Sequence, residues 1–186
     1  MGVALDPVGG RVAALVVRRS ATDPARLAWE VVIDLAPIDL GGERLRGSLV
    51  FDRIPWASGD WRELSIRGLE REAGGEAQCA LFLEPEGVEC DPILAEHAHL
   101  SLAHDRPGYL RVALELDIGA AEPGLGERLS IDVALPFSGV VLHPGHLTPF
   151  PEDAETAHAL VASLVDPDAF PSCARDDEAW VAKPKG

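Results

Sequence analysis

Basic residues are scarce in this chain, and lysine is almost absent. The 186 residues include 16 lysines and arginines against 31 aspartates and glutamates, so the formal net charge is −15. The only lysines are Lys183 and Lys185, and this preference for arginine is typical of a GC-rich bacterial genome. A surface of this charge repels nucleic-acid phosphates and anionic membranes. The composition therefore excludes nucleic-acid and membrane-surface binding. It leaves open a basic partner protein, a cation or solubility alone as the reason for the charge, and any macromolecular partner is expected to be a basic protein.

Long apolar runs and paired cysteines are also missing. No apolar stretch approaches the roughly 20 residues that span a bilayer. Residues 1–10 contain no basic segment followed by an apolar one, so we expect no secretory signal. The cysteines are Cys79, Cys90 and Cys173, an odd number that argues against a disulfide framework. Free thiols indicate a reducing compartment, and we predict a cytoplasmic protein.

The common catalytic motifs are absent as well. The sequence has no G-x-S-x-G nucleophile elbow, no phosphate-binding glycine loop before a helix and no C-x-x-C pair. Cys79 stands among apolar neighbours and is predicted to be buried. Cys90 lies between Glu89 and Asp91, whose charges disfavour a thiolate. These absences predict a protein that is not an enzyme and needs no cofactor.

What the sequence has in quantity is alternation of apolar and polar residues. In residues 109–118, Val112, Leu114 and Leu116 alternate with Arg111, Ala113, Glu115 and Asp117. In residues 128–137, large apolar residues likewise alternate with polar or small ones. Successive side chains of a strand point to opposite faces of the sheet, so this period of two indicates half-buried, mostly antiparallel strands. The two segments predict a hairpin.

Similar short segments, separated by glycine and proline turns, fill most of the chain. We therefore predict an all-β fold, an antiparallel β-sandwich of about nine strands, with a closed β-barrel as the alternative. Residues 1–186 are expected to form a single domain with a β-sandwich core over residues 11–142. The apolar run at residues 12–17 predicts a central or fully covered strand. Apolar spacing changes to a helical period after Pro151, which predicts a helix over residues 151–166 and a polar tail over residues 167–186.

Tryptophans supply the first candidate site. Trp56 and Trp61 flank a short loop that also contains Asp60, and two indoles on one loop can form a platform for a sugar ring or an anchor for a protein partner. The alternative is that both indoles pack against one end of the sandwich. Trp29 alternates in phase with Val31 and Ile33, so it is predicted to lie in the core.

Histidines supply the second candidate site. His97 and His99 lie two residues apart on a predicted strand, while His143 and His146 bracket a Pro-Gly turn. Imidazole pairs at such spacings can bind zinc, iron or nickel when a third ligand is present. A histidine pair on a strand and a later histidine in a turn also occur in cupins. The glutamate and glycines of cupin motifs are not at matching positions, so no family is recognised; the alternative places His97 and His99 on a solvent-facing strand surface.

Three functional hypotheses follow. The first is a non-enzymatic, acidic protein-interaction module of a bacterial system, of the immunity, adaptor or assembly type. The second is a carbohydrate- or ligand-binding β-sandwich that uses Trp56 and Trp61. The third is a cupin-like metal enzyme that uses the four histidines named above. The sequence indicates neither the partner nor the oligomeric state.

Overall fold

The structure is a computed structural model that describes residues 5–55, 65–72, 77–85, 88, 90–119, 125 and 127–185. Its described residues form eleven strands and one α-helix. The strands are β1 (Pro7–Val17), β2 (Arg26–Leu40), β3 (Glu43–Pro55), β4 (Ser65–Glu72), β5 (Gln78–Pro85), β6 (Ile93–Leu94), β7 (His97–Arg106), β8 (Tyr109–Asp117), β9 (Arg128–Leu142), β10 (Cys173–Asp176) and β11 (Ala179–Ala182), and the helix is α1 (Ala154–Ala162). The predicted all-β class with one C-terminal helix is confirmed.

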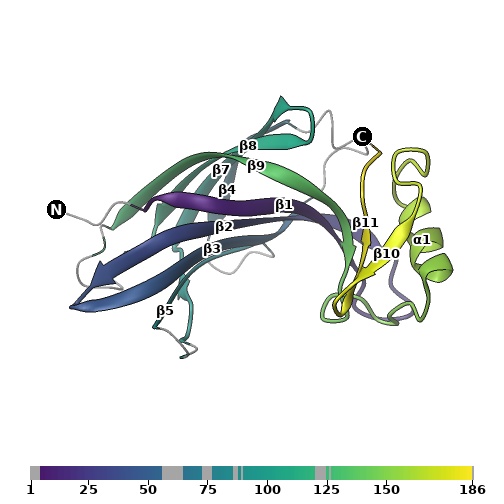
Figure 1. The fold of residues 1–186 in the computed structure, drawn as a ribbon, viewed down its shortest axis with the longest axis horizontal. Helices are drawn as coiled ribbons and strands as arrows, with labels where there is room; N and C mark the ends of the chain where they lie inside the picture. The colour runs from purple at the N-terminus through teal and green to yellow at the C-terminus, as the bar shows by residue number, and fades with distance from the viewer. Residues whose placement is uncertain are drawn as a thin grey trace.

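The strands form a sandwich-like arrangement of two layers that share one long strand. One layer has the order β4-β7-β8-β9, and the other continues through β9-β1-β2-β3-β5-β6 (Figure 1). The first part of β9 pairs antiparallel with β8, whereas its last part pairs in parallel with β1. The sheet is not closed into a barrel, because the described strand order ends at β4 and β6. The sandwich, rather than the barrel alternative, is therefore the fold.

The crossing of β9 between the layers depends on one glycine. The pairing of β1 with β9 shifts between Val12–Phe137 and Ala14–Val140, and Gly139 lies inside this shift with φ of 110°. L side chains rarely adopt this conformation. A Cβ at Gly139 would also clash with the backbone carbonyl oxygen of Ala182 on β11. The bulge therefore lets β9 change layers while β11 lies close beside it.

The predicted hairpin and its two faces are present. β8 and β9 pair in unbroken register from Tyr109–Pro136 to Asp117–Arg128. Along β8, Val112 and Leu114 are buried, while Arg111 and Glu115 are exposed. The alternation predicted from the sequence thus separates a core face from a solvent face.

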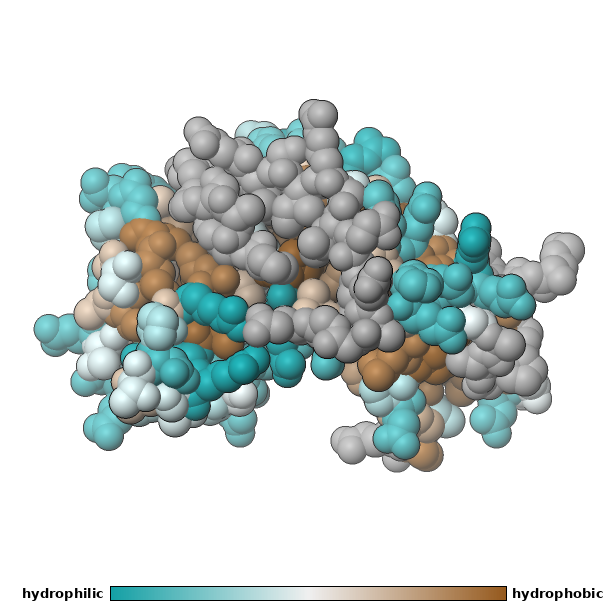
Figure 2. Space-filling view, turned by 180° about the vertical axis from the view of Figure 1, so that it is seen from behind, coloured by the Kyte–Doolittle hydropathy of each residue, from teal (hydrophilic) through white to brown (hydrophobic). Residues whose placement is uncertain are grey.

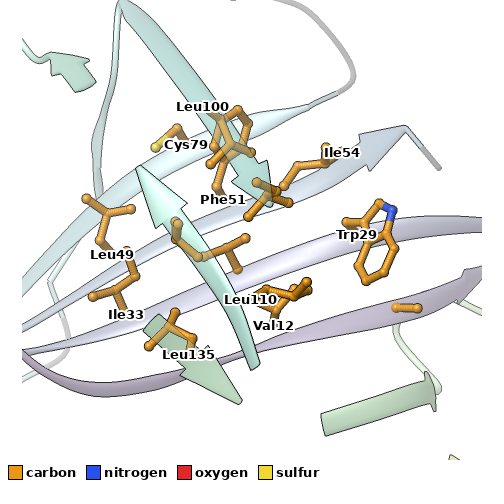
Figure 3. Packing of buried hydrophobic residues seen from close by; sticks show 14 of the residues in the cluster. Val12, Trp29, Ile33, Leu49, Phe51, Ile54, Cys79, Leu100, Leu110 and Leu135 are labelled. Carbon is orange, nitrogen blue, oxygen red and sulfur yellow. The ribbon is translucent and has the colours of Figure 1, made fainter. Parts of the chain in front are cut away.

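The core lies between the two layers. Side chains from the β1–β2–β3 layer and from β7, β8 and β9 meet there in one cluster, as Figure 3 shows for Ile33, Phe51, Leu100 and Leu135. Trp29 is fully buried in this cluster, as predicted, and its ring lies 5.6 Å from that of Phe137. Each large apolar side chain removed from water contributes about 1.5–3 kcal/mol.

Strand β1 is the covered central strand that the sequence predicts. It pairs with β2 on one side and with β9 on the other. Successive residues Val12 and Ala13, which point to opposite faces, are both fully buried. A continuous apolar run is thus accommodated without exposing either face.

Helix α1 is shorter than the sequence predicts, spanning Ala154–Ala162 rather than residues 151–166. Asp153 is the N-cap, because its side chain accepts a hydrogen bond of 2.7 Å from the backbone nitrogen of Thr156. This bond lowers the pKa of Asp153. Ser163 is the C-cap of the helix, and Ala157 and Val161 are its buried residues. Capping at both ends, rather than the apolar period, sets its length.

The segment expected to be a polar tail is instead a hairpin. β10 and β11 pair with each other, and β11 also pairs antiparallel with the end of β9. Trp180 is buried on β11 and its Nε1 donates a hydrogen bond of 3.1 Å to the carbonyl oxygen of Pro151. The strands have four residues each, too few for alternation to distinguish them from a polar tail.

Candidate functional site

The tryptophan platform lies outside the described residues. Trp56, Asp60 and Trp61 all belong to the part of the chain between β3 and β4 that the structure does not describe. The carbohydrate-binding hypothesis therefore stays a prediction.

His97 and His99 lie on the solvent face of β7. His97 is exposed and His99 is half-buried, and the register places them opposite Asp117 and Glu115 of β8. A shallow groove of about 580 Å³ crosses this face, lined by His97, Ala98, His99, Glu115, Leu116, Asp117, Arg128, Leu129 and Ser130. On this polar face of the sheet, the histidines of β7 lie opposite the carboxylates of β8.

His143 and His146 lie in the turn that follows β9. Their ring centroids are 5.8 Å apart. The backbone nitrogen of Gly145 donates a hydrogen bond of 3.1 Å to Nδ1 of His143. His146 joins the turn to β1 through its carbonyl oxygen, which accepts from the backbone nitrogen of Arg18 at 2.9 Å. The second histidine pair is thus built into a tightly bonded turn.

The structure does not bring the two histidine pairs together. His99 pairs with Glu115 of β8, which in turn pairs with Ser130 near the beginning of β9. His143, in contrast, follows the end of β9. At about 3.3 Å per residue, the intervening strand is roughly 40 Å long. Within the described part of the chain, no three histidine, cysteine, aspartate or glutamate side chains are placed to hold a metal ion.

The cysteines are three separate thiols. Cys79 is buried on β5, as predicted, while Cys90 is exposed. Cys173 begins β10, and partial burial raises the pKa of its thiol. Raising this pKa disfavours the thiolate that a nucleophile or a metal ligand needs.

A groove of about 800 Å³ lies beside the C-terminal hairpin. It crosses the solvent side of β2, β1, β9 and β11, which the sheet order places next to one another. Its lining consists of Arg11, Glu30, Phe137, Ser138, Val141, His143, Asp176, Asp177, Glu178, Ala179, Val181, Lys183 and Pro184. We call this surface the hairpin groove.

The hairpin groove has an acidic rim and a partly apolar floor. Asp176, Asp177 and Glu178 are consecutive and exposed at the turn between β10 and β11. Arg11 is paired with Glu30, with 3.2 Å between Nη2 and Oε2. Val141 and Val181 are half-buried and directly paired across β9 and β11. The groove can therefore offer carboxylates to cationic side chains and a small apolar surface beneath them.

Sequence reasoning missed this groove. Arg11 and Asp176 are 165 positions apart, and the acidic triplet is assigned to the expected tail. The only sequence feature that pointed to the hairpin groove was the acidic triplet itself, followed by the apolar residues of β11.

Apolar side chains are also exposed elsewhere. Figure 2 shows hydrophobic areas in the left and right parts of the rear face, next to hydrophilic residues. Val8, Val88 and Leu94 are the large apolar side chains that are more than half exposed among the described residues, at 64%, 53% and 54%. They belong to β1, to the connection between β5 and β6, and to β6 itself, so they do not define one site.

Comparison with known proteins found no match for this chain among protein families, curated proteins or solved structures. No helix in the described residues combines the length and the apolar character needed to cross a membrane.

Proposed function

We propose that this protein is a non-enzymatic protein-interaction module whose acidic surface binds a basic partner protein. The observation that carries the proposal is the hairpin groove, in which Asp176, Asp177 and Glu178 line the edge of a partly apolar floor. Such a module is expected to belong to a bacterial system and to be of the immunity, adaptor or assembly type. Cys79, Cys90 and Cys173 form no disulfide bond with one another, which supports a reducing, cytoplasmic location.

Charge and shape have separate roles in the proposed interaction. A net charge of −15 produces a negative potential that accelerates encounter with a positive surface. Exposed ion pairs contribute only about 0–1 kcal/mol each, so charge alone does not supply affinity. Apolar contact with Val141 and Val181 on the groove floor supplies the rest of the binding free energy. The partner is therefore expected to present basic side chains next to apolar ones.

A synthetic peptide of alternating lysine and valine tests this proposal. An extended peptide of this kind presents cations on one side and apolar groups on the other. We expect it to bind in a saturable manner by fluorescence anisotropy, and a glutamate–valine peptide not to bind. Its association rate should fall steeply between about 0.05 and 0.5 M salt, because screening shortens the range of the attraction.

Matched variants locate the binding surface. The triple variant Asp176→Asn, Asp177→Asn, Glu178→Gln removes three charges from the groove, and asparagine tolerates the positive φ of 53° at position 177. We expect roughly tenfold weaker binding, from three lost ion pairs. The control variant Glu43→Gln, Glu115→Gln, Glu127→Gln has the same net charge, with all three changes at exposed positions outside the groove. Equal losses in both variants would assign the binding to overall charge and contradict a role for the groove.

A further inference from the structure

The lining of the hairpin groove contains one residue whose charge is opposite to that of the acidic rim. Lys183 follows β11 directly, is exposed and lines the groove. The other lysine of the chain, Lys185, is not among the described lining residues. The position of Lys183 relative to the acidic rim bears on the kind of partner that the groove fits.

The pairing of β11 with β9 places Lys183 at one end of the groove. Ala182 pairs with Val140 of β9. A Cβ built at Gly139 would lie 3.2 Å from the Cα of Lys183, so these two residues are neighbours on adjacent strands. Lys183 is therefore level with the bulge at which β9 changes layers.

Lys183 also lies on the groove side of β11. Along this strand Ala179 and Val181 are half-buried, whereas Trp180 and Ala182 are buried. Alternate residues of a strand face the same side, and Lys183 continues the series of Ala179 and Val181. All three of these residues line the groove.

The acidic rim lies at the opposite end of the groove. Trp180 pairs with Leu142, the last residue of β9, and the acidic triplet precedes Trp180 in the chain. The triplet is therefore level with His143, which lines the same end. Gly139 and His143 are four residues apart. At roughly 3.3 Å per residue, the basic and acidic ends are separated by about 13 Å, with the paired valines of the floor between them.

The charged groups at both ends are available to a partner. Arg11 and Glu30 also line the groove, but they are paired with each other at 3.2 Å. Within the described part of the chain, no ion pair engages Lys183 or the three acidic residues of the rim. All four of these side chains belong to exposed residues. The groove therefore has a negative end and a positive end, both open to solvent.

We propose that Lys183 makes the hairpin groove specific for an extended segment that carries both charges, with basic side chains at the acidic rim and a carboxylate side chain opposite Lys183. This inference rests on the proposed function, because it concerns the same groove. A segment with cations along its whole length would place one of them beside Lys183, and such repulsion is a common source of specificity. A second copy of this chain does not fit the description, since two surfaces of net charge −15 repel each other.

The geometry of the groove also fixes the spacing of the charges. Every second side chain of an extended segment faces the same surface, and four residues span about 13 Å. A segment with basic residues at its first and third positions, an apolar residue at the fifth and an acidic residue at the seventh therefore matches the acidic rim, the valine floor and Lys183 in order.

Three peptides that differ at one position test this inference. Each has lysine at the first and third positions, valine at the fifth, serine between them and blocked termini, and the seventh residue is glutamate, glutamine or lysine. Attraction to the net negative charge of the protein predicts that the lysine peptide binds most tightly. Lys183 predicts the opposite order. By fluorescence anisotropy at low salt, we expect the glutamate peptide to bind about threefold more tightly than the glutamine peptide, and the glutamine peptide about threefold more tightly than the lysine peptide.

Variants of the two lysines identify the residue responsible. Lys183→Gln should remove the preference for the glutamate peptide, and Lys183→Glu should make the lysine peptide the tightest of the three. Lys185→Gln makes the same change of charge two residues later, outside the described lining, and should keep the native order. Circular dichroism of each variant without peptide verifies that it is folded.

The outcomes separate this inference from the proposed function. Binding of all three peptides to the native protein with the lysine peptide tightest would refute the role of Lys183 and leave the interaction with a basic partner standing. Loss of the preference in Lys185→Gln to the same extent as in Lys183→Gln would also overturn the inference, because it would assign the effect to the charge of the C-terminal residues in general. Absence of binding by all three peptides would contradict the proposed function and this inference with it.

Discussion

The guanidinium of Arg18 donates a hydrogen bond of 2.8 Å to the carbonyl oxygen of Pro149, a residue 131 positions later in the chain. The same side chain bonds the carbonyl oxygen of Thr148, and the backbone of Arg18 pairs with residues on either side of Leu147. A single residue directly after β1 therefore positions the turn that links β9 to helix α1. The histidine pair of that turn depends on this attachment.

Replacing Arg18 by methionine should destabilise the protein by about 1–3 kcal/mol. Methionine keeps an unbranched apolar stem but leaves two carbonyl oxygens without their charged donor. Urea unfolding followed by tryptophan fluorescence measures the change. Arg44→Met, at an exposed position of β3, is the control and should unfold close to the native midpoint. An Arg18 variant as stable as this control would show that the turn is held by its backbone bonds alone.

Leu114→Ala should be far more destabilising than Glu115→Ala. Leu114 is 1% exposed in the core, so its truncation leaves a cavity that costs about 2–5 kcal/mol. Glu115 is its neighbour on β8 but points to solvent, where substitutions change stability by about 0.5 kcal/mol or less. Denaturant unfolding of the two variants provides the comparison. Similar losses would mean that the solvent face of β8 is covered by another part of the protein.

Gly139→Ala should destabilise the protein by more than about 2 kcal/mol. The added Cβ meets the carbonyl of Ala182 and forces φ away from 110°, at the position where β9 changes layers. Gly41→Ala is the control, because Gly41 also has positive φ, at 60°, but has open space around its Cβ position. Thermal unfolding of both variants separates the clash from the conformational penalty. Equal shifts would contradict a close approach of β11 to β9.

Asp153 should make the stability of the protein depend on acid pH. Hydrogen bonds from the backbone and side chain of Thr156 hold the pKa of Asp153 below its ordinary value. A lowered native-state pKa means that the stabilisation is complete above the unfolded-state pKa of about 3.9 and is lost as the pH falls through the native-state pKa. The stability difference between the native protein and Asp153→Ala should therefore be larger at pH 7 than at pH 3.

Asp153→Asn is the matched control for this prediction. An asparagine side chain can also cap the helix, but it does not titrate. Its stability relative to Asp153→Ala should change much less between the two pH values, as measured by urea unfolding. A difference that is independent of pH for the native protein would contradict a cap formed by the Asp153 carboxylate.

Long alternating segments were predictable, and short or capped elements were not. Residues 109–118 and 128–137 contain enough alternating positions to identify strands and to separate their faces, because a period of two repeats several times. Hairpin β10–β11 contains only four residues per strand, and its polar composition resembles that of a tail. Helix α1 begins at Ala154 because Asp153 caps it through one side-chain hydrogen bond, which the apolar spacing after Pro151 does not encode.

By itself, the sequence determined the all-β class, the covered strand at residues 12–17, the buried Trp29 and the strongly acidic composition, since these follow from local periodicity and from residue counts. Tertiary structure alone decided where separated residues meet. It distributed the four histidines between the two ends of β9, brought Asp176 and Arg11 into the lining of one groove, and gathered Arg18, Arg26 and Arg53 around one cleft. Sheet order and a bulge in β3 bring these side chains together, and hydrogen bonds between distant parts of the chain leave no periodic pattern in the sequence.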